Sequence, residues 1–156
     1  MATQINPFLW KKCGLVTFQG PMVGVDLPDG LDATTEELFW RLLTSPKKAG
    51  SVIPAGNPSV TVRKGKGSGR LLGGNLAHLA GAVGTIHMPS FKDALLFIED
   101  IGEEPYRIDR MLTQLRHAKI LDQVKGVLGG QFTDCEIKGA SKPTLTVDEV
   151  LREFGG

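Results

Sequence analysis

Apolar positions in the second half of the chain follow two spacings, one typical of strands and one typical of helices. Residues 94–98 form a near-continuous apolar run, which predicts a strand buried on both faces. The segment that begins at Pro105 has apolar residues at i, i+3, i+4 and i+7, which predicts an amphipathic helix with one buried stripe. The stripe consists of Ile108, Met111, Leu112 and Leu115.

Shorter elements surround these two. Residues 70–72 predict a short strand, and Asn75 stands as the N-cap of a helix that extends to Ala82. Residues 119–124 predict another short helix, and residues 126–131 (GVLGGQ) predict the next buried strand. The alternation of strands and helices predicts an α/β fold, with a layered sheet that is at least partly parallel and flanked by helices.

Two capping boxes indicate where other helices begin. Thr34 lies three residues before Glu37, and Thr146 lies three residues before Glu149. At this spacing, each side chain can accept a hydrogen bond from the backbone N–H of the other residue. The first box opens a helix that ends at a Ser-Pro pair, and the second opens the last helix of the chain. Residues 14–18 (GLVTF) are rich in β-branched and aromatic side chains and predict a short strand.

The composition changes between residues 47 and 69, where glycine, proline, serine and lysine are frequent. We expect a flexible hairpin region there, with residues 59–63 (SVTVR) alternating as one of its strands. The glycines of this region do not lead into Gly-Lys-Ser or Gly-Lys-Thr at a helix start, so a nucleotide phosphate loop is not predicted. Ser68 is interpreted as a loop residue because the glycine pattern of a nucleophile elbow is missing around it.

The overall composition excludes several classes of partner. A chain of 156 residues that is 41% hydrophobic has the size of one ordinary domain with one core. Its 18 basic and 17 acidic residues give a net charge of +1, so charge offers no case for binding nucleic acid or an anionic membrane surface. No apolar run approaches the roughly 18 residues that a membrane span needs. The first residues also lack the pattern of a signal peptide.

Cysteines and histidines give no sign of a metal site. Cys13 and Cys135 lie far apart in the sequence and form no CxxC motif, which favours a reduced, cytoplasmic chain. The three histidines lack the spacing of zinc ligands and have no evident serine or cysteine partner. They are His78, His87 and His117. We therefore expect no metal.

The candidate chemistry lies at the end of the predicted strand, where Glu99 and Asp100 follow the apolar run. A carboxylate in this position can orient the histidine of a hydrolase triad, act as a base, or cap the next turn. Because adjacent residues of a strand point to opposite faces, only one of the two can face a cleft. The residues alone leave these roles open.

Three ordered motifs resemble one known family. GRLLGGNLAHLAGAVGT, FIEDIGEEPYRIDRMLTQLR and GVLGGQFTDC together are similar to the C-terminal half of the LD-carboxypeptidases. These serine peptidases include murein tetrapeptide carboxypeptidases and microcin C self-immunity proteins. The resemblance implies that residues 1–156 are a single C-terminal α/β domain of a two-domain enzyme, truncated at both ends. Residues 1–24, which contain GLVTFQGPM, resemble the segment close to the interdomain linker.

The resemblance also implies an activity, and it implies that the catalytic residues are shared between this chain and other parts of the protein. The family hydrolyses the amide bond between an L- and a D-centre of murein tetrapeptides, without a metal or organic cofactor. Its triad consists of serine, glutamate and histidine, and the glutamate falls on Glu99, while Asn75 falls on a residue of the substrate cleft. The nucleophile belongs to an N-terminal domain upstream, and the histidine belongs to a segment downstream. We therefore expect the parent protein to be an enzyme and the isolated chain to be inactive.

The expected partners are the N-terminal nucleophile domain of the same protein and a small peptide substrate, and the resemblance allows a homodimer. Two other interpretations stay open at this point. The chain can be a non-catalytic α/β module that binds a peptide or a protein partner, or a folding unit without a function of its own. The sequence does not separate a murein peptide from a microcin-type substrate.

Overall fold

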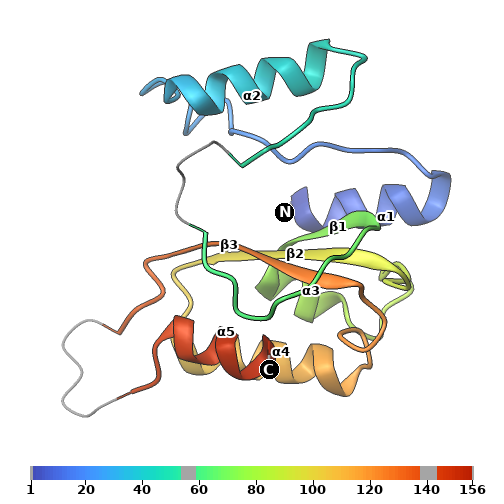
Figure 1. The fold of residues 1–156 in the computed structure, drawn as a ribbon, viewed down its shortest axis with the longest axis vertical. Coiled ribbons are helices and arrows are strands. Elements are labelled where there is room, and N and C mark those ends of the chain that lie inside the picture. Colours follow the sequence, from blue (N-terminus) through green and yellow to red (C-terminus); the bar gives the residue numbers. More distant parts are fainter. Residues whose placement is uncertain (1, 54–58, 138–143, 156) are drawn as a thin grey trace. The chain divides into compact units, whose positions relative to one another are not determined.

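The computed structural model describes residues 2–53, 59–137 and 144–155. The chain divides into two compact units, of which the larger comprises residues Met1–Phe18 and Thr61–Gly156 and the smaller Gln19–Val60. In chain order, the larger unit contains α1 (Ala2–Cys13), β1 (Arg70–Asn75), α3 (Leu76–Ala82), β2 (Ala94–Ile101), α4 (Pro105–His117), β3 (Gly126–Thr133) and α5 (Val147–Gly155) (Figure 1). The assignment of residues 1–156 to a single domain of a larger protein stays a prediction.

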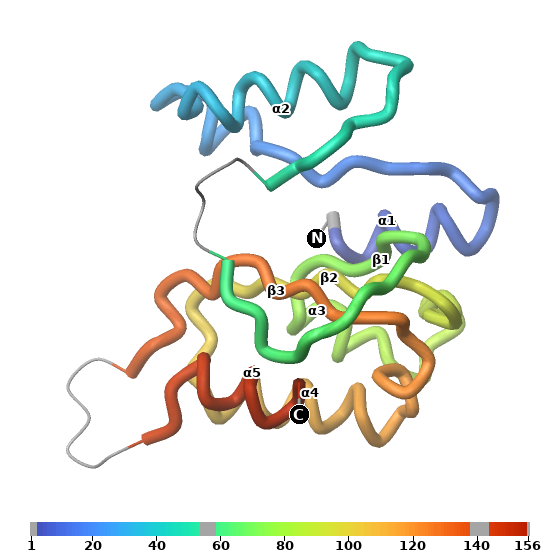
Figure 2. The backbone as a smooth tube through the Cα atoms, in the orientation of Figure 1, coloured from blue at the N-terminus to red at the C-terminus, as the bar shows by residue number. Residues whose placement is uncertain are grey.

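The larger unit is built on a parallel sheet with the strand order β1-β2-β3. The chain passes from β1 to β2 through α3 and from β2 to β3 through α4, as Figure 2 traces. In the register of β1 and β2, Asn75 pairs with Glu99 at the end of both strands. The pairing of β2 with β3 shifts between Ile98 and Asp100. The α/β fold with a parallel sheet is therefore confirmed.

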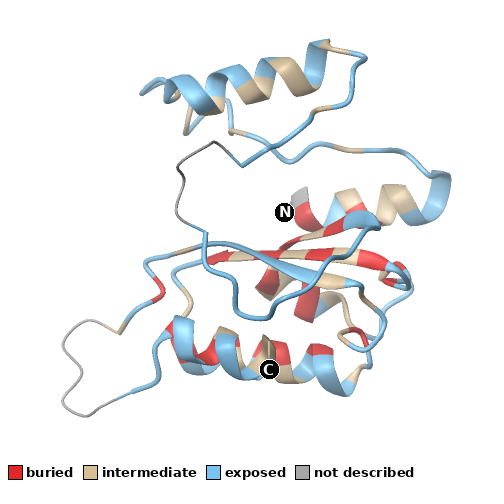
Figure 3. Cartoon of the chain, viewed as in Figure 1, coloured by how far each residue is buried: buried red, intermediate tan, exposed pale blue. Residues whose placement is uncertain are grey.

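The core lies between the sheet and the helices that connect its strands. α3 packs against β1 and β2, and α4 packs against α3 and α5. Figure 3 shows buried residues along β2 and on these helices. Alternate residues of β2 from Ala94 to Asp100 are buried, whereas Leu95, Phe97 and Glu99 on its other face are half-buried. The predicted stripe of α4 is confirmed, because its four apolar residues are all buried.

Gly73 allows β1 and β2 to approach each other closely. Its φ of +147° lies in a region that L-residues avoid. A Cβ atom at this position would lie 2.7 Å from the backbone N and C atoms of Phe97 and would overlap the Phe97 carbonyl oxygen. The first glycine of the Gly73-Gly74-Asn75 segment, called the GGN motif below, thus serves the backbone of the strand pair.

Two predicted strands are wrong. Residues 14–18 form no strand and instead follow α1, which the sequence analysis missed. Residues 59–63 form no strand either, so the described part of the expected hairpin region contains none, and its residues 54–58 lie outside the described residues. The sheet described here consists of β1, β2 and β3, and neither segment pairs with it. Segments that alternate correctly still need a neighbouring strand for their backbone hydrogen bonds.

Two further differences concern the region after α4. Residues 119–124 form turns in place of the predicted helix, because Lys119 adopts a φ of +60° just after α4 ends. β3 is present as predicted, but it is not a buried strand. Val127 and Leu128 keep 49% and 45% of their surface exposed, because β3 is the last strand of the described sheet.

The smaller unit contains α2 (Ala33–Thr44), which ends before Pro46 as predicted. Its N-cap is Asp32, whose carboxylate accepts hydrogen bonds from the backbone N–H groups of Thr34 and Thr35. Hydrogen bonding to the Thr35 side chain, followed by the bond from the Thr35 backbone N–H, holds the pKa of Asp32 below its usual value. The predicted capping box of Thr34 and Glu37 is therefore wrong by two positions, since the helix begins earlier. None of the described helices is long and apolar enough to span a bilayer.

Candidate active site

Asn75 and Glu99 meet at the carboxyl edge of the parallel sheet. β1 ends on Asn75, β2 nears its end at Glu99 and Asp100, and the strand register pairs Asn75 with Glu99. In parallel α/β sheets, ligands bind beyond the carboxyl ends of the strands. The candidate residues of the GGN and FIED motifs therefore share one edge of the fold.

Asn75 is held at three points. Its Oδ1 accepts a hydrogen bond from the backbone N–H of His78 at 3.1 Å, which makes Asn75 the N-cap of α3 as predicted. Its Nδ2 donates to Oδ1 of Asp100 at 2.7 Å, and its backbone N–H donates to Oγ1 of Thr3 at 3.0 Å. One side-chain partner is a donor and the other is an acceptor, so the orientation of the amide is determined.

Asp100 occupies the face of β2 that the helices cover, and only 3% of its surface is exposed. Its Oδ2 accepts a hydrogen bond from the backbone N–H of Ala77 at 2.9 Å, and its Oδ1 accepts one from its neighbour Ile101 at 2.9 Å in addition to the bond from Asn75. Ala77 lies in the first turn of α3, where a negative charge is favoured by the helix dipole. Asp100 therefore connects the end of β2 to the start of α3.

Glu99 lies on the opposite face of β2 and is half-buried. The register shift between β2 and β3 occurs at this residue. On the neighbouring strand, Gly130 leaves room for it, since a Cβ atom there would lie 3.2 Å from the Cβ of Glu99 and 2.8 Å from the Phe97 ring. Irregularities of this kind re-aim side chains next to active sites. As strand geometry predicts, the two adjacent carboxylates thus face different environments.

The loop after β2 brings a second acidic group and a thiol close to this edge. Glu104 is the N-cap of α4 without a side-chain capping bond, and Glu103 forms an ion pair with Arg107 at 3.5 Å. The Cys135 thiol is buried beside this loop, and its burial raises its pKa. Both Cys135 and the exposed Cys13 are free thiols.

The other candidates of the sequence lie elsewhere. His78 belongs to α3 and His117 to the last turn of α4, while His87 is exposed and its ring lies 4.9 Å from that of Phe8. Ser68 is exposed in the segment before β1. Within the part of the chain that the structure describes, no three His, Cys, Asp or Glu side chains are grouped to hold a metal ion.

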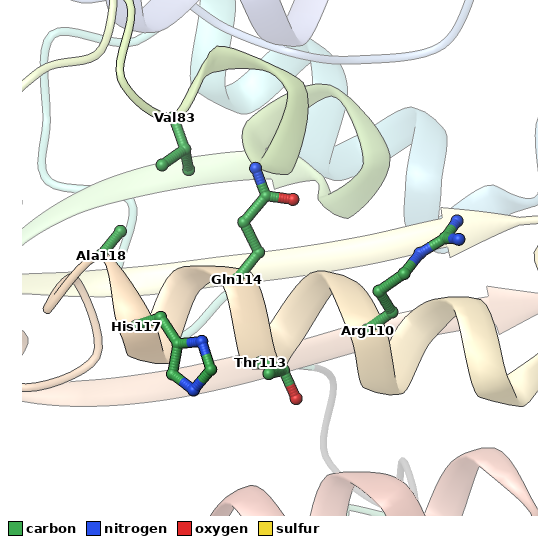
Figure 4. A pocket seen from close by; sticks show the side chains of 6 residues that line it. All are labelled: Val83, Arg110, Thr113, Gln114, His117 and Ala118. Atoms are coloured by element: carbon green, nitrogen blue, oxygen red, sulfur yellow. The ribbon is translucent and has the colours of Figure 1, made fainter.

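An open pocket of about 490 Å³ lies along α4, away from the candidate residues of the sheet edge. Figure 4 shows its lining, in which the Gln114 side chain points towards α3 and donates a hydrogen bond to the Ala80 carbonyl at 2.9 Å. The lining residues are Val83, Arg110, Thr113, Gln114, His117 and Ala118.

Sequence reasoning missed one residue of this arrangement, Thr3, and one contact, the hydrogen bond between Asn75 and Asp100. Thr3 belongs to α1, a helix that no sequence signal indicated, and it is buried where α1 packs on β1 and α3. Asp100 was recognised as one of two strand-end carboxylates, but its bond to Asn75 depends on the strand register. The sequence did contain one relevant signal. Asn75 and Asp100 each follow a predicted strand, and the ends of parallel strands lie at the same edge of a sheet.

Comparisons with known proteins identify the family. Residues 68–156 match the LD-carboxypeptidase C-terminal domain. The probable murein peptide carboxypeptidase of Bacillus subtilis is 33% identical over 153 residues, which cover 97% of this chain and 47% of that protein. The crystal structure of muramoyltetrapeptide carboxypeptidase from Oxalobacter formigenes superposes with a TM-score of 0.77 and 36% identity, over 96% of this chain and 50% of that one.

The microcin C7 self-immunity protein MccF, known from Escherichia coli, is also similar. Its complex with aspartyl sulfamoyl adenosine and its active-site mutant, in which a serine, an asparagine and a lysine are replaced by alanine, each give a TM-score of 0.73 and 28% identity. Both matches cover 98% of this chain and 52% of MccF. The chain thus spans about half the length of the relatives that it matches over most of its own residues. It belongs to the LD-carboxypeptidase family, with residues 68–156 corresponding to the family's C-terminal domain.

Proposed function

We propose that this chain is the C-terminal part of a serine-type LD-carboxypeptidase that hydrolyses the L,D amide bond of murein tetrapeptides. In this proposal Glu99 is the glutamate of the catalytic triad, and Asn75 lines the substrate cleft. The observation that carries the proposal is the strand register, which pairs Asn75 with Glu99 at the carboxyl edge of the sheet, within the residues that match the family's domain.

The surroundings of Glu99 suit a carboxylate that orients a histidine. It belongs to the central strand of the sheet, where its backbone pairs with Asn75 of β1 and lies at the register shift between β2 and β3. It is half-buried, and Gly130 leaves space beside it. A carboxylate held in this way selects the histidine tautomer and stabilises the imidazolium that forms when the serine loses its proton. Asp100 is less suited to this role because its oxygens already accept three hydrogen bonds.

The role of Asn75 is supported by the comparison with MccF, whose active-site mutant replaces an asparagine. Asn75 is the only asparagine in the sequence of residues 68–156. Its Nδ2 carries two hydrogens, and the bond to Asp100 uses one of them. The second hydrogen can be donated to a carbonyl or carboxylate oxygen of a peptide.

The remaining parts of the machinery are proposed to come from outside these residues. The serine and the oxyanion hole belong to an N-terminal nucleophile domain of the same protein, and the histidine to a segment that follows. One member of a triad has no nucleophile to support, so the isolated chain gives no turnover. The proposed mechanism uses no metal or organic cofactor, and we place the reaction in the cytoplasm, with a homodimer as the proposed assembly.

The test compares the isolated chain with the longer protein that carries the flanking sequence. Each is incubated with a murein tetrapeptide that ends in L-lysyl-D-alanine, and released D-alanine is measured by mass spectrometry. We expect release by the longer protein and none by residues 1–156. Release by the isolated chain would overturn the proposed division of the triad, and no release by either would overturn the peptidase function.

The similarity to MccF favours one alternative substrate. Because an MccF structure contains aspartyl sulfamoyl adenosine, the same assay includes this compound as a second substrate. Cleavage of the tetrapeptide but not of the sulfamoyl adenosine would support murein recycling. The opposite preference would assign a microcin-type role to the same site, and binding of either compound without cleavage would favour a non-catalytic module.

A further inference from the structure

The carboxylate of Asp100 accepts three hydrogen bonds, one of which serves neither the strand end nor the helix start. The hydrogen bond from the backbone N–H of Ala77 fastens α3 to β2, and the bond from the backbone N–H of Ile101 lies within the end of β2. The third is the shortest, at 2.7 Å, and comes from the side chain of Asn75. Hydrogen bonds to an ionised acceptor are stronger than those between neutral groups.

The bond from Asn75 determines how its amide is turned. The backbone N–H of His78 binds Oδ1, and Asp100 binds Nδ2, so a flipped amide would place an N–H against an N–H and an oxygen against a carboxylate. The bond to the anion also raises the electron density on Oδ1, which strengthens the bond from His78. The backbone of Asn75 is fixed separately by Thr3.

We propose that Asp100 is a positioning residue for the LD-carboxypeptidase site, acting through Asn75. Its buried carboxylate holds the amide in one orientation, so that the second Nδ2 hydrogen is presented at the sheet edge beside Glu99. This inference rests on the proposed function in one respect, namely that Asn75 contacts the substrate. It assigns different tasks to the two adjacent carboxylates. Glu99 orients the histidine of the triad, whereas Asp100 orients Asn75, which in turn contacts the substrate.

A purely structural role for Asp100 is the competing explanation. It would operate through Ala77 and Ile101 and would lower stability without a specific effect on Asn75. The two explanations therefore differ in what happens to the Asn75 side chain when the fold is kept. Asp100→Asn has nearly the same shape, but it replaces one acceptor oxygen by an NH₂ group.

The first experiment is NMR spectroscopy of the ¹⁵N-labelled chain of residues 1–156, with the Asn75 side-chain peaks assigned through Asn75→Gln. In the wild-type chain, we expect one Nδ2 proton to be shifted downfield and to exchange with D₂O more slowly than the other. Asp100→Asn should move this proton to the position of a free asparagine amide. Asp122→Asn, at an exposed carboxylate, is the matched control and should leave the peaks unchanged.

Wild-type peaks typical of a free amide, or peaks that do not respond to Asp100→Asn in a folded chain, would overturn the inference. The wild-type measurement needs no variant, so it decides the matter even if Asp100→Asn fails to fold. Neither result depends on peptidase activity. A failure of the proposed function would leave these spectra unchanged and is thereby distinguished from a failure of this inference.

The second experiment is a double-mutant cycle in the longer protein, with KM and kcat for the tetrapeptide measured separately. Asn75→Ala and Asp100→Asn should each raise KM on the order of tenfold, because each removes the same bond to the substrate. The double variant should raise KM no further than Asn75→Ala alone. A product of the two single effects, on the order of a hundredfold, would show that Asp100 acts independently of Asn75 and would contradict the inference.

Discussion

Replacement of Gly73 by alanine should destabilise the larger unit far more than alanine at Gly81 or Gly84, two glycines of the same unit with open space around them. The added Cβ would lie 2.7 Å from two backbone atoms of Phe97, and these belong to the central strand, which cannot rotate away as a side chain can. The residue would also keep a φ of +147°, which costs a non-glycine residue about 1–3 kcal/mol. Separation of β1 from β2 would weaken the adjacent backbone hydrogen bonds by about 1 kcal/mol each. We therefore expect a total loss of about 3–5 kcal/mol in the free energy of unfolding.

Two glycines of the same unit separate these contributions. Gly84 has a φ of +81° with open space around it, so Gly84→Ala should cost only about 1–2 kcal/mol of conformational strain. Gly81 lies in α3 with open space and no positive φ, so Gly81→Ala should stabilise the protein by about 0.5–1 kcal/mol.

Urea denaturation measures the three variants in a Trp40→Phe background, in which Trp10 is the remaining tryptophan. Trp10 reports on the larger unit, because the guanidinium of Arg70 at the start of β1 lies 4.2 Å from the centre of its ring. A Gly73→Ala variant that loses no more stability than Gly84→Ala would refute the close approach of β1 and β2. The register that pairs Asn75 with Glu99 would then lose its support.

Other predictions concern the last helix and the thiols. Hydrogen bonds from the backbone N–H and hydroxyl of Thr146 lower the pKa of Glu149, so the capping box of α5 stabilises the fold fully above the ordinary carboxyl range. This contribution is lost as the pH falls through the lowered pKa. A pH titration of the α5 amides by NMR should therefore show fraying in acid, and Glu149→Ala, which has no acceptor oxygen, should show the same fraying at every pH. Fraying that is independent of pH in the wild-type chain would contradict the capping role. Iodoacetamide should modify the exposed Cys13 rapidly, whereas Cys135 should react only on unfolding, because its thiol is buried and its pKa is raised. The two rates are compared by mass spectrometry. Equal rates would show that Cys135 is accessible and would contradict this prediction.

The parts of the fold that sequence could predict are those determined by local spacing. The stripe of α4 depends on residues three and four apart, and the caps at Asn75 and Thr146 depend on side chains within three residues of the helix start. These interactions form whenever the helix forms. For the same reason, the adjacent carboxylates Glu99 and Asp100 could be assigned to opposite faces before their surroundings were known.

The parts that could not be predicted depend on distant neighbours. Residues 14–18 have the β-branched and aromatic side chains of a strand, but they have no pairing partner in the described sheet. α1 contains Pro7, which lacks the N–H of a regular helical residue, and its helix is held in place by packing on β1 and α3. The bond between Asn75 and Asp100 spans 25 residues and exists because of the parallel register. Local patterns thus located the candidate residues, while tertiary structure determined which carboxylate holds Asn75.

The most direct test of the account replaces Glu99 by glutamine in the longer protein and measures kcat/KM for the tetrapeptide. The exchange keeps the size of the side chain but removes the charge that would stabilise an imidazolium. We expect kcat/KM to fall by about 10³–10⁴-fold, as for the carboxylate of other serine triads. Glu104→Gln, at the exposed N-cap of α4, should leave it within about twofold of the wild type. If Glu99→Gln retains the wild-type kcat/KM in a folded protein, Glu99 is not the triad glutamate and the proposed site is wrong.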